Sequence, residues 1–260
     1  MTIKQISSRS NPWYKKIKDL ISDNKAYRAQ GRIWLEGDHL CQAAVERGWQ
    51  FEEMVFTDTV SRDEVDHWRR YSQSIMQLPQ PLMDSLSGLG SAAWICGVVV
   101  LPQRSSLNPL IPTVVLDRLQ DPGNAGSILR SAAAFGFTQI ISTPQTVALW
   151  SPKVVRSAMG AHFGLQIFES LSVDAILELK MPVLLTSSHQ GHALHELSNQ
   201  QQISNPCMWV LGHEGQGVSQ EWLAHPHQLV RIDQPGGEES LNVAAAAAIC
   251  LYSSSRTFSH

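Results

Sequence analysis

Short apolar runs alternate with amphipathic stretches along the second half of the chain. The runs that we expect to form strands are Thr113–Leu116, Ile140–Ile141, Gln166–Phe168, Val183–Thr186, Met208–Leu211 and Leu229–Ile232. Helical stretches lie between most of them, and an alanine-rich helix is expected over Leu241–Tyr252. Strands that are apolar throughout need cover on both faces, so the pattern predicts a mostly parallel sheet with helices on both sides. The predicted fold class is α/β.

The first part of the chain has a different pattern, in which a long basic helical stretch precedes shorter elements. We expect a helix over about residues 12–30 and another over Asp38–Arg47, with Asp38 as its N-cap. The expected strands are Arg32–Leu35, Met54–Phe56, Ile75–Leu78 and Trp94–Val100. These elements predict a small α/β or α+β sandwich of about 100 residues.

A segment rich in proline and serine separates the two patterns. Pro102–Pro112 contains three prolines, two serines and an asparagine without a sustained apolar period, which is typical of a linker. We therefore predict a small domain over residues 1–101, a linker over 102–112 and a larger domain over 113–260.

Composition narrows the class of protein. Hydrophobic residues make up 43% of the 260 residues and charged residues 17%, a balance that excludes a disordered chain. The longest apolar runs, Trp94–Leu101 and Val243–Tyr252, are much shorter than the roughly 18 residues of a membrane span. The polar N-terminus lacks the apolar region of a signal peptide, and four scattered cysteines indicate reduced thiols. We expect a cytoplasmic protein.

Positive charge is concentrated near the N-terminus. Residues 1–32 contain eight Lys and Arg against two Asp, although the whole chain has a net charge of −3. Trp13 and Tyr14 lie in this stretch, and aromatic rings beside cations can stack a base. The alternative is a solvated helix face whose aromatic rings pack inward. The candidate contacts to RNA phosphates are Arg9, Lys15, Lys16, Lys18 and Arg28.

Three polar loops follow three of the predicted strands, and ligands of such sheets bind outside the carboxyl ends of the strands. The loops are Asp121–Gly126, Gly212–Gly217 and Asp233–Asn242. Asn124 is placed to cap a helix or to offer its amide to a ligand, and Ser240 is the expected cap of the last helix. Each loop alone has an ordinary interpretation as a turn and a helix cap, but together they predict a shared pocket.

The segments DPGNAGSILRSAAAFG, VLGHEGQGVS and ID…ESLNVAAAAAICLY resemble, in order and spacing, three motifs of the SpoU/TrmH family of RNA ribose 2′-O-methyltransferases. KVVRSAMGAHFGLQIF, between the first two, also resembles the family. SSRSNPWYKKIKDLI and WLEGDHLCQAAVERG resemble the small RNA-binding domain, similar to a ribosomal-protein fold, that precedes many members. The likeness covers nearly the whole chain.

The resemblance implies S-adenosylmethionine (AdoMet) as methyl donor and RNA as substrate, with ribosomal RNA favoured over transfer RNA. It also implies a homodimer with the active site near the subunit interface, and a deep C-terminal trefoil knot. Pattern alone would predict an unknotted sheet, because knots are rare. The positions that match the cofactor-binding loops are Thr186, Ser187, Leu211, Gly212, Gly217, Ile232 and Leu241.

The resemblance further implies an in-line attack by a ribose 2′-hydroxyl on the sulfonium methyl group. A guanidinium stays protonated up to about pH 12, so we expect Arg130 to hold an RNA phosphate and polarise the hydroxyl, with general-base action less favoured. Glu214 is expected to fix Arg130 or a neighbouring backbone group, and the other polar residues to orient the ribose and the loops. The residues that match the catalytic positions are Asn124, Arg130, Glu214, Ser240 and Asn242.

Some residues depart from the family pattern or suggest another function. His213 and the pair Asp233-Gln234 replace commoner residues at the rim of the expected cofactor pocket. One alternative is a non-catalytic RNA-binding or ribosome-associated protein that keeps the fold; another is the same chemistry on transfer RNA. A dinucleotide-dependent oxidoreductase is disfavoured because the GxGxxG spacing is absent. No metal is expected: apart from Glu196, no carboxylate or Cys accompanies the run His189, His192 and His195.

Overall fold

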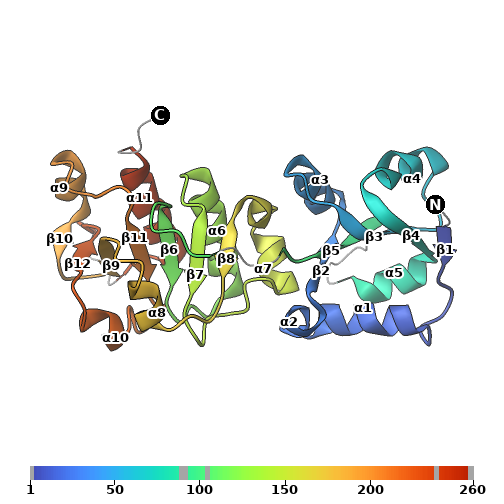
Figure 1. The fold of residues 1–260 in the computed structure, drawn as a ribbon, viewed down its shortest axis with the longest axis horizontal. Helices are drawn as coiled ribbons and strands as arrows, with labels where there is room; N and C mark the ends of the chain where they lie inside the picture. The colour runs from blue at the N-terminus through green and yellow to red at the C-terminus, as the bar shows by residue number, and fades with distance from the viewer. Residues whose placement is uncertain (1–2, 88–92, 103–105, 237–239, 257–260) are drawn as a thin grey trace. The chain divides into compact units, whose positions relative to one another are not determined.

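The protein is described by a computed structural model covering residues 3–87, 93–102, 106–236 and 240–256, and it divides into two compact units (Figure 1). Unit 1 contains residues 1–103 and 150–163, and unit 2 contains residues 104–149 and 164–260. The later segment of unit 1 is anchored by Trp49, whose Nε1 donates to the carbonyl of Phe163 at 3.1 Å. The rings of Trp49 and Trp150 lie 6.1 Å apart.

Unit 1 is built on a five-stranded mixed sheet in the order β1-β4-β3-β5-β2. Strands β1, β4 and β3 are parallel, and β5 runs antiparallel to both β3 and β2. Helices α1 and α5 cover one face, and α3 and α4 cover the other (Figure 1). The elements are β1 (Ile3–Gln5), α1 (Pro12–Ser22), α2 (Ala26–Gln30), β2 (Arg32–Glu36), α3 (Asp38–Glu46), β3 (Phe51–Thr57), α4 (Arg62–Arg69), β4 (Ser72–Leu78), α5 (Gln80–Leu86), β5 (Ile95–Val100) and α7 (Pro152–Ser157).

The structure corrects three sequence predictions in unit 1. The expected helix over 12–30 is two helices, because Asp23 ends α1 and its Oδ1 accepts a hydrogen bond from the backbone of Lys25 at 2.8 Å. Asp38 is not the N-cap of α3; Gly37, with a φ of 97°, holds that position. The edge strand β1 was missed, because three residues are too few for a recognisable alternation.

Unit 2 contains a seven-stranded sheet in the order β10-β12-β9-β11-β6-β7-β8, and every pair of neighbours is parallel. The predicted α/β class with a large parallel sheet is therefore confirmed, while the trefoil knot stays a prediction. The elements are β6 (Thr113–Leu116), α6 (Pro122–Ala134), β7 (Gln139–Ser142), the 3₁₀ helix η1 (Ala161–Gly164, which begins in unit 1), β8 (Gln166–Phe168), α8 (Val173–Leu177), β9 (Val183–Ser187), β10 (His192–Ala193), α9 (Leu194–Asn199), β11 (Met208–Leu211), α10 (Gln220–Leu223), β12 (Gln228–Arg231) and α11 (Val243–Ser255).

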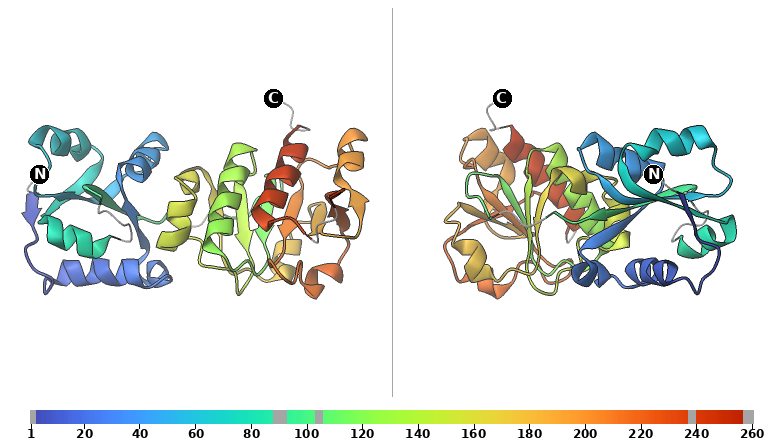
Figure 2. Two further views of the ribbon diagram at one scale, coloured as in Figure 1. Left: turned by 180° about the vertical axis from the view of Figure 1, so that it is seen from behind. Right: turned by 45° about the vertical axis from the view of Figure 1, so that its right-hand side comes forward.

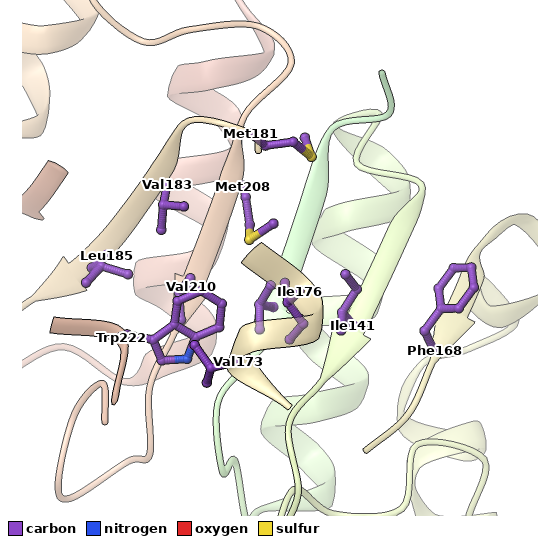
Figure 3. Packing of buried hydrophobic residues seen from close by; sticks show 11 residues of the cluster. Ile141, Phe168, Val173, Ile176, Met181, Val183, Leu185, Met208, Val210 and Trp222 are labelled. Atoms are coloured by element: carbon purple, nitrogen blue, oxygen red, sulfur yellow. The ribbon is translucent and has the colours of Figure 1, made fainter. Parts of the chain in front are cut away.

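The central strands of unit 2 are covered on both faces, which explains why β6, β7 and β11 are buried at every position. On one face, Ile141 and Val210 pack with Ile176 of α8 and the fully buried Trp222 of α10 (Figure 3). On the other face lie α6 and α11, side by side (Figure 2). The loops that follow the strands are therefore left at one edge of the sheet.

The second part of the predicted linker is ordered against unit 2. The backbone N–H of Asn108 donates to Oε1 of Gln139 at 2.9 Å, and Nε2 of Gln139 donates back to the carbonyl of Asn108 at 3.2 Å. Leu107 packs against the hydrophobic core of the unit. Residues 103–105 of the linker lie outside the described residues.

All four cysteines are buried free thiols. Burial raises the pKa of the Cys207 and Cys250 thiols to about 12, so these groups stay protonated at neutral pH. In the part of the chain that the structure describes, no helix combines the length and the apolar character that a membrane span requires.

Candidate active site

Glu214 joins the loop after β11 to the loop after β6. Its Oε1 accepts hydrogen bonds from the backbone of Asp121 at 2.9 Å and from Nδ2 of Asn124 at 3.2 Å. Its Oε2 accepts from the backbone of Gln120 at 3.2 Å. Partial burial raises the pKa of this carboxyl, but the hydrogen bonds outweigh that effect and lower the pKa below its ordinary value. Glu214 is thus an ionised tie between two loops, and its partners are backbone groups and Asn124.

Asn242 adds the third loop to this tie. It is the N-cap of α11, and its Oδ1 accepts from the backbone of Ala244 at 2.9 Å and of Ala245 at 3.3 Å. Its Nδ2 donates to Oδ1 of Asn124 at 3.0 Å. The predicted cap Ser240 is therefore wrong, and α11 begins at Val243, two residues later than expected. A continuous chain of side chains runs from Asn242 through Asn124 to Glu214.

Asn124 is free to serve in this chain because another residue caps its helix. Asp121 is the N-cap of α6, and its Oδ1 accepts from the backbone of Asn124 at 2.7 Å. Of the two roles expected for Asn124, the structure excludes the cap. Both ends of its amide instead point to other loops, one end to Glu214 and the other to Asn242.

The structure does not bring the other two candidate catalytic residues into this chain. Arg130 lies six residues after Asn124 on α6, which is about 240° around an α-helix, so the two side chains leave from different faces. Its exposed guanidinium makes no hydrogen bond or ion pair with the described residues. Ser240 is exposed and lines the neighbouring cavity.

A cavity of about 500 Å³ lies at this edge of unit 2. Its walls come from the loops after β9, β11 and β12 and from the start of α11, and Glu214 is part of the lining. Leu211 does not line it, because this residue is fully buried at the end of β11. The predicted cofactor residues that do line it are Thr186, Ser187, Gly212, Gly217, Ile232 and Leu241.

The glycine loop, residues 212–217, is closed on itself by two backbone hydrogen bonds. His213 donates to the carbonyl of Gly217 at 3.0 Å, and Gly217 donates back at 2.9 Å. A Cβ on Gly212 would lie 2.2 Å from the backbone of both Gly217 and Val218, so no side chain fits there. Gly217 has a φ of 67°, which other residues rarely adopt. The glycines allow the loop to fold tightly beside the cavity.

Comparison with known proteins places the chain in a family. A sequence profile described as SpoU rRNA Methylase family matches residues 112–252, more than half of the chain. The chain belongs to this family. A tRNA/rRNA methyltransferase of Synechocystis, named as uncharacterized, is 31% identical over 98% of this chain and 94% of its own length. The 23S rRNA (guanosine(2553)-2′-O)-methyltransferase of Bacillus subtilis is 26% identical over 96% of this chain and 98% of its own length.

The fold agrees with that assignment. The AdoMet-bound structure of an rRNA methyltransferase from Sinorhizobium meliloti has a TM-score of 0.85 and 24% identity, and each chain is covered over 99% of its length. The resemblance to the SpoU/TrmH family is confirmed, and the family includes proteins solved with AdoMet.

The departures from the SpoU pattern have local structural roles. Nδ1 of His213 accepts from the backbone of Gly215 at 3.0 Å, which tightens the glycine loop. Asp233 accepts from Nε of Arg231 at 3.0 Å and lies 3.1 Å from Nδ1 of His195. Residues 237–239 of the third motif lie outside the described residues.

Two neighbouring residues of this SpoU site were missed by the sequence analysis. Asp117 is 1% exposed, and its carboxylate accepts from the backbone of Ser219 at 2.7 Å and from Oγ1 of Thr143 at 3.1 Å. Arg118 has a φ of 57° and donates to Oε1 of Gln216 at 3.0 Å and to the carbonyl of Gly217 at 3.2 Å. The sequence did contain a signal for them, because Asp117 and Arg118 are two charged residues directly after a strand that is buried throughout.

The predicted RNA contacts are all exposed in unit 1, on α1, α2 and the segment before α1. Lys18 donates to the carbonyl of Ser85, and Arg28 donates to the hydroxyl of Tyr27 at 3.1 Å. Tyr14 is 4% exposed and hydrogen bonds to Ser85, so it is not available for stacking on a base. Nε1 of Trp13 donates to Glu53 at 2.7 Å.

The three histidines of the run 189–195 lie in different local elements. His192 begins β10, His195 lies in α9 beside Asp233, and His189 lines the cavity. Within the residues that the structure describes, no group of three or more His, Cys, Asp or Glu is placed to hold a metal ion.

Proposed function

We propose that this protein transfers a methyl group from AdoMet to a ribose 2′-hydroxyl of RNA, with ribosomal RNA as substrate. The observation that carries the proposal is the hydrogen-bonded chain Glu214–Asn124–Asn242, which binds three loops together beside a cavity at the carboxyl edge of a parallel sheet. Ligands of open parallel sheets bind at this edge. The names of several relatives specify 2′-O-methylation of ribosomal RNA.

The cavity suits AdoMet in size and chemistry. Its volume of about 500 Å³ falls within the roughly 300–1,000 Å³ of small-molecule sites. Ile232 and Leu241 supply apolar contacts, and the glycine loop exposes backbone groups to its interior. Oγ1 of Thr186 donates to the carbonyl of Val210 at 3.1 Å, which leaves its lone pairs for a donor on the ligand. These residues would hold AdoMet largely through backbone and hydroxyl groups.

When bound, AdoMet supplies a methyl group on a positively charged sulfur that leaves readily. The task of the protein is to position the ribose and to ease loss of the hydroxyl proton. Arg130 presents a guanidinium without a partner among the described residues, and such a group binds phosphate through paired hydrogen bonds. We assign Arg130 to the RNA phosphate and the 2′-hydroxyl, and Asn124, Ser240 and Asn242 to orientation of the ribose and the loops.

The part of unit 1 that residues 1–101 form is proposed as the RNA substrate-binding domain. Its support is the excess of positive charge in residues 1–32, of which Lys15, Lys16 and Lys18 are exposed on α1. Exposed lysines bind the phosphate backbone without reading sequence. Recognition of the target nucleotide is then left to unit 2.

We also propose a homodimer that pairs through α11. This helix exposes Ile249 at 40% and Tyr252 at 55%. Large apolar side chains on one helix are typical of interfaces between subunits. Sedimentation equilibrium should give twice the mass of 28.8 kDa for the wild type. Ile249→Glu should give a monomer, and a monomeric wild type would refute the pairing.

The activity is tested with the purified protein and tritiated AdoMet. Ribosomal and transfer RNA from a strain lacking the gene serve as substrates, and sites are mapped by resistance to alkaline cleavage, which 2′-O-methylation confers. We expect one protected nucleotide in ribosomal RNA, which is lost with Arg130→Ala. Protection only in transfer RNA would change the substrate. RNA binding without methyl transfer would favour the non-catalytic alternative.

A further inference from the structure

We propose that Arg118 is a positioning residue that holds the glycine loop and orients Gln216 for AdoMet. The inference rests on the proposed function, because it concerns the same cavity. Arg118 does not line that cavity, but both acceptors of its guanidinium, Gln216 and Gly217, do. Its effect on the ligand would therefore pass through the loop.

The backbone at Arg118 is fixed from two sides. Its own N–H donates to Oγ1 of Thr143 at 3.0 Å, and the preceding Asp117 holds the backbone of Ser219, beyond the far end of the glycine loop. Arg118 has a φ of 57°, a conformation that costs free energy for a residue with a Cβ. The strained backbone is held in place by these contacts and directs the side chain across to the loop.

At Gly217, where Arg118 binds, the loop is otherwise held by backbone hydrogen bonds to His213 and not by a side chain of its own. Gly215 and Gly217 have no side chains, and glycine loses more conformational entropy on ordering than other residues. The carbonyl of Gly217 accepts from the backbone of His213 at 3.0 Å and from the guanidinium at 3.2 Å. Arg118 thus supplies a second hydrogen bond to the carbonyl oxygen of the residue that closes the loop.

The same guanidinium fixes which end of the Gln216 amide is occupied and which end is left for a ligand. Arginine is only a donor, so Gln216 must turn its oxygen toward Arg118. Its Nε2 has no acceptor among the described residues and remains a donor at the cavity wall. A carboxylate or a hydroxyl of AdoMet is the type of group that this donor would bind.

If Arg118 acts by positioning the loop, its removal should weaken AdoMet binding; if it acts only through its charge, its removal should strengthen AdoMet binding. AdoMet carries two positive groups and one carboxylate, so removing a nearby cation would strengthen binding if charge alone mattered. The charge of Arg118 is also partly balanced, because Nε lies 3.6 Å from Oδ2 of Asp117. Weaker binding after loss of the guanidinium would therefore come from the loop.

The test compares Arg118→Asn with Lys180→Asn. Asparagine tolerates a positive φ, so the first change removes the guanidinium without adding backbone strain. Lys180 is an exposed cation of the same unit with a φ of 51°, and it does not line the cavity. The pair is matched in charge change and backbone conformation.

Calorimetry should give AdoMet binding about tenfold weaker for Arg118→Asn, which is about 1.4 kcal/mol. KM for AdoMet should rise by a similar factor, with kcat at saturation within about threefold of wild type. Arg118→Lys should recover part of the affinity. Lys180→Asn should leave the dissociation constant within twofold. In a Gln216→Ala background, the effect of Arg118→Asn should shrink, because one acceptor is already gone.

Unchanged or tighter AdoMet binding by Arg118→Asn would overturn the inference, as would an equal loss in Lys180→Asn. If Arg118→Asn is too unstable to measure, Arg118→Lys takes its place. Its AdoMet binding should be weaker than that of the wild type, and unchanged or tighter binding would overturn the inference. A wild-type protein that binds no AdoMet would instead refute the proposed function, so the two failures are distinguishable.

Discussion

Glu214→Gln removes the negative charge from the point where two loops are tied, while it keeps the size of the side chain. The amide oxygen can still accept from Asp121 and Asn124, at the positions now 2.9 and 3.2 Å from Oε1. The new NH₂ group, however, would face the backbone N–H of Gln120, which now donates to Oε2 at 3.2 Å. One hydrogen bond is lost and two are weakened.

The expected loss of stability is modest because Glu214 is exposed to solvent. A hydrogen bond to a charged group contributes about 1.5–3 kcal/mol when it is buried, and solvent screening reduces this severalfold. We therefore expect the free energy of unfolding of unit 2 to fall by about 1 kcal/mol at pH 7. Urea titration with hydrogen-exchange mass spectrometry on peptides from this unit would measure it.

The lowered pKa of Glu214 also predicts how the stability difference between wild type and Glu214→Gln changes with pH. The pKa of Glu214 is lowered in the folded protein, since the hydrogen bonds outweigh the raising effect of burial. Its contribution is therefore present above the unfolded pKa of about 4.3 and is lost as the pH falls through the lower folded value. The difference between wild type and Glu214→Gln should begin to narrow as the pH falls below the unfolded pKa, and should close only once the pH is below the lower folded pKa.

A matched control is Glu221→Gln, which changes an exposed glutamate on α10 of the same unit. We expect its effect on the free energy of unfolding to stay within about 0.5 kcal/mol at every pH. The reasoning would be refuted if Glu214→Gln cost no more than Glu221→Gln at pH 7. A difference that failed to narrow as the pH is lowered from the unfolded pKa through the acid limb of the stability curve would equally exclude the ionised tie.

Three further predictions concern the site and the RNA surface. Arg130→Ala should lower kcat at least about 100-fold and leave AdoMet affinity within twofold, since the guanidinium acts on RNA; retained turnover, measured by methyl incorporation, would contradict its role. Gly212→Ala should weaken AdoMet binding at least about tenfold in calorimetry, because the added Cβ lies 2.2 Å from the backbone of Gly217. Gly236→Ala, which meets no atom within 4 Å, is its control, and equal losses would argue against the loop. Charge reversal at Lys15, Lys16 and Lys18 should weaken RNA binding and flatten its salt dependence in filter-binding assays. The affinity for AdoMet should not change. If the salt dependence of RNA binding were unchanged, the lysines of α1 would belong to a solvated helix face that does not bind RNA.

Local signals predicted the strands of unit 2 well, because their pattern is set by burial on both faces. The predicted run Met208–Leu211 is β11, and Thr113–Leu116 is β6. Helix caps were predicted less well. Ser240 and Asn242 are both good caps in isolation, and the choice between them depends on where α11 packs. The break between α1 and α2 likewise depends on a turn at Asp23 that periodicity does not reveal.

The sequence by itself determined the α/β class, the family and the three loops, because apolar periodicity and motif spacing are written along the chain. Only the tertiary structure decided how those loops are joined. Glu214 meets Asn124 across 90 positions, and Asn124 meets Asn242 across 118. Arg118 donates hydrogen bonds to the glycine loop, whereas Arg130 is exposed to solvent. Such pairings follow from the order of parallel strands in the sheet, which brings distant strand ends to one edge, and no local pattern encodes that order.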